Sequence, residues 1–69
     1  MGETLHVERI GRTATSAIEL VHSPDDDSYY LSNTDFQNNR SRVSVEIFRH
    51  AEIARKAWHA GLVKWEPWH

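Results

Sequence analysis

Hydrophobic and polar residues alternate over two stretches near the N-terminus, which is the pattern of half-buried strands. In the first, residues 4–10, Leu5 and Val7 alternate with polar residues. In the second, residues 13–22, Ile18 and Leu20 share the side that we expect to face the core. Between them, Gly11 suits a tight turn because glycine accepts a positive φ. The sequence therefore predicts an N-terminal β-hairpin.

A polar loop at 23–28 follows, in which proline fixes φ and aspartate or serine side chains bond to nearby backbone amides. Residues 29–32 are expected to return from this loop as a partner strand. The next segment, 33–41, is polar and turn-prone, with Phe36 as its one large apolar anchor. These features predict a second hairpin and a long connection after it.

Residues 42–47 alternate again, and this pattern predicts a strand with Val43, Val45 and Ile47 facing inward. A helix that already begins near Ser44, with the serine as its cap, is the alternative.

A period close to 3.6 residues replaces the alternation in the last third of the chain and predicts an amphipathic helix over 48–60. At about 100° per residue, an apolar stripe forms on one side of this helix, and Ile53 falls off it as an exposed apolar residue. Gly61 suits the left-handed position that ends many helices. The stripe consists of Ile47, Ala51, Ala54, Trp58 and Leu62.

These elements predict an α+β fold: a small antiparallel sheet of three to four strands with one C-terminal amphipathic helix packed on one face. Residues 62–65 are a candidate edge strand, which Pro67 would end because proline has no amide to donate.

At 69 residues the chain has room for a single domain, 1–69, with a modest core. It has no cysteine, so a bound partner or self-association as a homodimer is a way to add to that core. No segment approaches the roughly 20 apolar residues of a membrane span, and the N-terminus lacks a signal-peptide pattern. We therefore expect a cytoplasmic protein that does not enter membranes.

Charge is unevenly distributed along the chain. Residues 1–35 hold seven acidic and two basic side chains, which gives −5, and residues 36–69 hold six basic and three acidic ones, which gives +3. Such asymmetry steers partners or favours contacts between copies, whereas the alternative is that both halves carry solvated faces.

No metal site, cofactor or enzymatic activity is expected. Adjacent aspartates at 25–27, without the glycine and later glutamate of a calcium loop, are typical of a solvated turn. Zinc would need three or four ligands around one point. His50 and His59 lie on roughly opposite sides of the predicted helix, so they cannot share an ion. For a site built from His6 and His22, nothing in the sequence indicates a third ligand. No serine occurs in a nucleophile-elbow context.

Nucleic-acid binding is an alternative function, because basic residues of the second half could form a stripe beside aromatic rings. The net charge of −2 counts against it, since attraction to phosphate dominates non-specific binding. The residues of this stripe are Arg40, Arg42, Arg49, Arg55 and Lys56.

Recognition of a larger protein fits the sequence best, because tyrosine and tryptophan are enriched at binding hot spots. Adjacent tyrosines on a strand face opposite ways, so one of them is expected to face outward. The alternative is that Trp58 and Trp65 are core, that Trp68 covers an edge, and that the interface is only a dimer contact. The candidate partner-binding residues are Tyr29, Tyr30, Asp25, Asp26, Asp27, Ile53, Trp65 and Trp68.

A tiny chain without cysteine or active-site motifs is typical of the stand-alone inhibitors and adaptors that phages and mobile elements produce. The function expected from sequence is therefore a small non-enzymatic module that occludes a surface of a larger protein.

Overall fold

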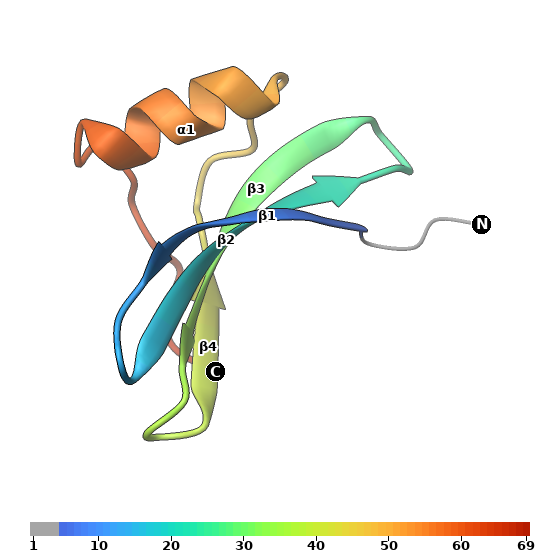
Figure 1. Cartoon of the computed structure of the whole chain (residues 1–69). Helices are drawn as coiled ribbons and strands as arrows, with labels where there is room; N and C mark the ends of the chain where they lie inside the picture. Colours follow the sequence, from blue (N-terminus) through green and yellow to red (C-terminus); the bar gives the residue numbers. More distant parts are fainter. Residues whose placement is uncertain (1–4) are drawn as a thin grey trace.

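A four-stranded antiparallel sheet and one helix make up the chain in the computed structural model, which describes residues 5–69 and side chains from Glu8 onward. The strands occur in chain order, β1-β2-β3-β4, and α1 lies across one face of the sheet (Figure 1). This confirms the predicted α+β architecture. The predicted alternation at Leu5 and Val7, and the side chain of His6, fall on residues whose side chains are not described. The elements are β1 (Leu5–Arg12), β2 (Ser16–Ser23), β3 (Ser28–Asp35), β4 (Arg40–Val43) and α1 (Ala51–His59).

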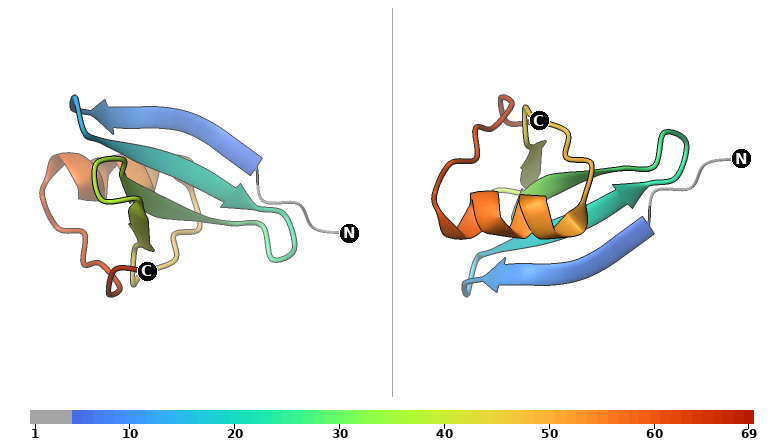
Figure 2. Two further views of the ribbon diagram at one scale, coloured as in Figure 1. Left: turned by 90° about the horizontal axis from the view of Figure 1, so that it is seen from below. Right: turned by 90° about the horizontal axis from the view of Figure 1, so that it is seen from above.

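The core lies between α1 and the sheet face that it covers (Figure 2). Leu20 and Leu31 are opposite each other on β2 and β3, and both are fully buried. They pack with Phe48 and Ala54, and Ile10, Tyr29, Trp58 and Trp65 are among the half-buried residues around them. We call this the helix face of the sheet and the other its open face.

Gly11 lies within β1, and the chain turns at residues 13–15, so the predicted turn at Gly11 is wrong. A Cβ on Gly11 would come within 3.1 Å of Cζ2 of Trp58. Glycine is needed here because Trp58 of α1 packs directly on the strand and leaves little room for a Cβ. A turn pattern in the sequence does not reveal this packing.

Helix α1 begins at Ala51, three residues later than predicted, because Phe48 still belongs to the sheet ladder. Tyr29 and Phe48 exchange two backbone hydrogen bonds of 2.8 Å, and His50 is extended. The helix ends as expected before Gly61, whose φ is +70°. Leu62, predicted on the apolar stripe, is 70% exposed, which corrects that part of the pattern. No helix in residues 5–69 is long and apolar enough to cross a bilayer.

Strand β4 is shorter than predicted, and its apolar residues do not face the core. Val43, Val45 and Ile47 are 36%, 51% and 64% exposed, so the inward orientation was wrong. Val43 is opposite Ser32 and therefore on the open face, and residues 45–47 leave the pairing with β3. Phe36 is also exposed and does not anchor the β3–β4 connection.

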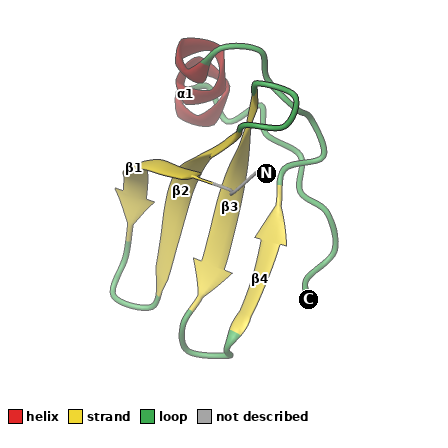
Figure 3. Cartoon of the chain, turned by 90° about the vertical axis from the view of Figure 1, so that its right-hand side faces the viewer, coloured by secondary structure: helices red, strands yellow, loops and turns green. Residues whose placement is uncertain are grey.

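The C-terminal tail runs beside β4 and covers its edge (Figure 3). The amide of Val45 donates to the carbonyl of Lys64, and the amide of Glu66 donates to the carbonyl of Val43. Of the predicted edge strand at 62–65, only an isolated bridge between Trp65 and Ser44 forms. Ser41 and His69 exchange two further hydrogen bonds, so the tail also contacts β4 beyond Pro67. The proline falls between the bonded amides of Glu66 and His69, where no donor is required.

Candidate binding groove

An apolar groove of about 450 Å³ lies on the open face, at the edge formed by β4 and the tail. Its apolar lining is Tyr30 of β3 together with Val43, Val45 and Ile47, and Ser44 and Glu66 complete it. This volume falls within the usual range of protein binding clefts, roughly 300–1,000 Å³. The three aliphatic side chains are the same ones that the sequence predicted to be buried.

A hydrogen-bonded bulge holds these side chains outward. Ser44 still pairs with β3, since its amide donates to the carbonyl of Leu31 at 2.8 Å. Its hydroxyl accepts from the amide of Leu31 at 3.1 Å and donates to the carbonyl of Glu46 at 2.8 Å. Phe48 then returns to the ladder opposite Tyr29. The excursion of 45–47 is therefore fixed at both ends.

Tyr30 forms the other wall of the groove. It lies on the open face, opposite the buried Val21, and is half-buried itself. In the described part of the chain its hydroxyl has no hydrogen-bond partner, so this polar end is available. Tyr29 lies on the helix face, where it packs against the core and makes a tilted ring contact with His22, with ring centroids 4.8 Å apart. The two tyrosines thus face opposite ways, as predicted.

One carboxylate lines the groove, and a second is exposed in the bulge beside it. Glu66 lines it, and Glu46 lies between Val45 and Ile47 in the bulge. Neither carboxylate has an ion-pair partner among residues 5–69. Two cations are close along the chain: Lys64 precedes Glu66 by two residues and accepts from the amide of Val45 through its carbonyl, and Arg49 follows Ile47 by two residues. Neither of them lines the groove.

The predicted acidic loop is the exposed tip of the β2–β3 hairpin, at the end of the strand that carries Tyr30. Asp26 accepts a hydrogen bond of 2.7 Å from the hydroxyl of Ser28, and this bond lowers the pKa of Asp26. Asp27 has a φ of 53° and lies 2.9 Å from Nε2 of His22. The aspartates thus shape the turn, and Asp25 is exposed beside them.

Trp65 and Trp68 hold the tail to the sheet through a stack with arginines of β4. The Arg42 guanidinium lies 5.2 Å from the ring centroid of Trp65 and 4.2 Å from that of Trp68, and Arg40 lies 4.3 Å from the Trp68 ring. Trp65 also packs against the core. Both candidate tryptophans therefore already contact their own chain, whereas the candidate Ile53 is 49% exposed on α1.

The basic residues of the predicted stripe are divided between β4, the segment before α1, and α1 itself. Arg55 forms an ion pair with Glu8, and this pairing lowers the pKa of the Glu8 carboxyl. Lys56 lies 3.9 Å from Glu52, and Arg40 lies 3.1 Å from Asp35. Three of the five cations are thus paired with carboxylates.

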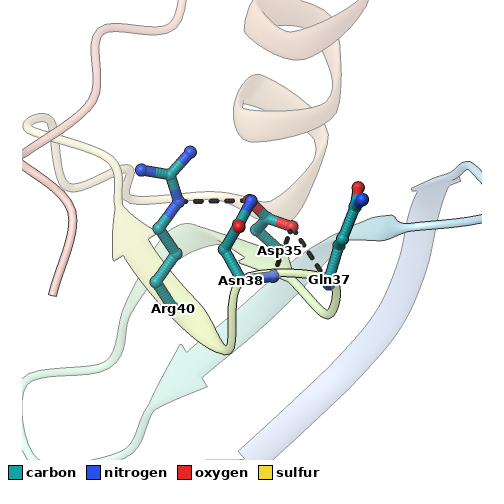
Figure 4. Close-up of polar contacts among 4 residues, drawn as sticks. All are labelled: Asp35, Gln37, Asn38 and Arg40. Atoms are coloured by element: carbon teal, nitrogen blue, oxygen red, sulfur yellow. Dashed lines mark hydrogen bonds and ion pairs between the residues drawn. The ribbon is translucent and has the colours of Figure 1, made fainter.

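A second hollow, of about 260 Å³, lies between Trp68 and the β3–β4 turn and has a mostly polar lining. The carboxylate of Asp35, which lines this hollow, is already hydrogen-bonded to residues of the β3–β4 connection and of β4 (Figure 4). Asp35 accepts from the amides of Gln37 and Asn38, from the side-chain amide of Asn38 at 2.8 Å, and from Arg40. The hydrogen bond from Asn38 is the main reason that the pKa of Asp35 is lowered.

Sequence reasoning included Tyr30 but missed Val43, Val45 and Ile47. Alternation along a strand shows which residues share a side, but not which side meets the helix. One signal in the sequence could have indicated the exposed side. Segments 42–47 and 62–66 are both short, and each carries a single carboxylate next to its apolar residues.

Comparisons with protein-family models, with curated proteins and with solved structures found no match for this chain.

Proposed function

We propose that the protein is a small binding module that docks a segment of a larger protein in the groove lined by Tyr30, Val43, Val45 and Ile47. The observation that carries this proposal is the ordered exposure of three aliphatic side chains on a bulge that is hydrogen-bonded at both ends. Contiguous exposed apolar surface of this kind marks interaction sites.

The groove offers what a binding hot spot requires. Burying an aliphatic side chain in an interface contributes roughly 1.5–3 kcal/mol, and a tyrosine adds a large ring with a polar end. The bulge is already fixed, so little conformational entropy is lost when a partner binds. In this role the protein acts as an inhibitor or adaptor that occludes a surface of its partner.

The test compares two pairs of serine substitutions at exposed aliphatic residues. Val45→Ser with Ile47→Ser removes apolar surface from the groove, and Ile53→Ser with Leu62→Ser removes it from α1 and the segment after it. All four side chains are about half exposed or more, so neither pair should unfold the protein. Circular dichroism and urea unfolding verify that both variants fold.

The tagged protein is used to capture partners from lysate of its native host, with and without nuclease treatment, and binding of the purified partner is then measured by calorimetry. We expect the groove pair to weaken binding at least about tenfold and the helix pair to change it little. Equal binding by the groove pair and the wild type would overturn the proposal. A partner that is lost on nuclease treatment would instead support nucleic-acid binding.

A further inference from the structure

We infer that the segment bound in the groove is basic: an apolar residue flanked by lysine or arginine, supplied by another protein rather than by a second copy of this chain. This inference rests on the proposed function and adds the chemistry of the partner.

The charge at the groove is the first argument. Glu66 is the one charged residue among those that line the groove, and Glu46 is an exposed residue of the bulge, between Val45 and Ile47 in the sequence. A carboxylate next to a surface that becomes buried loses hydration, which is unfavourable unless a cation replaces the water. Neither glutamate has an ion-pair partner among the described residues, so a basic bound segment would supply that cation.

The hairpin tip extends this negative surface along the strand that carries Tyr30. Asp25 and Asp26 are exposed there and have no ion-pair partner in the described part of the chain. Lys64, whose carbonyl accepts from the amide of Val45, and Arg49, two residues after Ile47, lie near the bulge, but neither lines the groove. A bound segment therefore meets negative charge beside its apolar residues, and electrostatic complementarity selects a basic one.

A second copy of this chain is a poorer occupant. A two-fold contact of groove on groove places the same surface on both sides, so Glu46 and Glu66 of each copy approach those of the other. Pairing of sheet edges is also obstructed, because β1 is interrupted by two register shifts and the tail covers β4. The groove thus suits a partner of opposite charge better than itself.

The test uses two synthetic peptides that share an apolar centre, Lys-Lys-Leu-Ile-Leu-Lys-Lys and Glu-Glu-Leu-Ile-Leu-Glu-Glu, titrated into isotope-labelled protein at low salt. Dissociation constants follow from the amide shifts. We expect the lysine peptide to bind on the order of tenfold more tightly, as a few exposed ion pairs provide. In Glu46→Gln with Glu66→Gln the two peptides should bind about equally, and Ile47→Ser should weaken both.

The outcomes separate this inference from the proposed function. If both peptides depend on Ile47 but the glutamate peptide binds equally well or better, the basic partner is refuted and the groove still stands. If the peptides bind the protein and Ile47→Ser has no effect, both proposals fall. A dimer seen in sedimentation that Ile47→Ser dissociates identifies a second copy as the occupant and overturns the inference.

Discussion

Replacing Ser44 by alanine removes the hydroxyl that fixes the bulge to the sheet. Ser44 is 5% exposed, and its hydroxyl is the acceptor for the amide of Leu31, a residue with no exposed surface. Without that acceptor, a buried donor is left unpaired, which costs about 1–3 kcal/mol. The carbonyl of Glu46 also loses its donor, but Glu46 is exposed and water can replace it.

We therefore expect Ser44→Ala to lower the free energy of unfolding by about 2 kcal/mol, and the melting temperature by about 8–16 °C for a domain of this size. Urea unfolding followed by tryptophan fluorescence measures the change, and Ser41→Ala is the matched control. Ser41 lies three residues earlier, in β4, but its side chain is exposed, so its substitution should cost less than about 0.5 kcal/mol. Equal stability of the two variants would refute the role assigned to the Ser44 hydroxyl.

Three further substitutions test other parts of the fold. Because the pKa of Asp35 is lowered from 3.8, its ionised form stabilises the fold above that pH. This stabilisation is lost as pH falls through the folded pKa. Asp35→Asn should therefore reduce the fall in the free energy of unfolding between about pH 5 and pH 2. An unchanged pH profile would contradict this. Trp68→Ala should lower stability by about 1–2 kcal/mol through loss of its contacts with Arg40 and Arg42. It should also speed hydrogen exchange at the Ser41 amide, and unaltered exchange there would show that the stack does not hold the tail. Gly61→Ala should cost about 1 kcal/mol in thermal unfolding, because φ is +70° although space for a Cβ is available, and a neutral result would contradict this strain.

The regular elements were predictable because local pattern determines them. The apolar stripe of α1 indicated its buried side, and the side of β2 predicted to face the core carries the buried Ile18 and Leu20. The alternation in β2 did not reveal that Ala17 and Val21, on its other side, are buried too. Gly61 was recognised because only its own backbone conformation matters there. Each of these signals is contained within a few consecutive residues.

The groove was not predictable because long-range pairing determines it. Val43 faces outward because β4 joins β3 with Ser32 opposite Val43, and the pattern of β4 alone is equally compatible with the reverse. Ser44 looked like a helix cap, but it instead continues the pairing with Leu31, 13 residues earlier in the chain. The fate of the tail likewise depends on arginines more than 20 residues away, as the contacts of Arg42 with Trp65 and Trp68 show.

The most direct test of the account is to map the bound surface by amide chemical shifts when the purified partner is added. We predict that the largest changes fall on Tyr30, on residues 43–47 and on Glu66, with little change along α1. Changes concentrated on α1 around Ile53, with the groove amides unmoved, would contradict the claim that this groove is where the protein binds its partner.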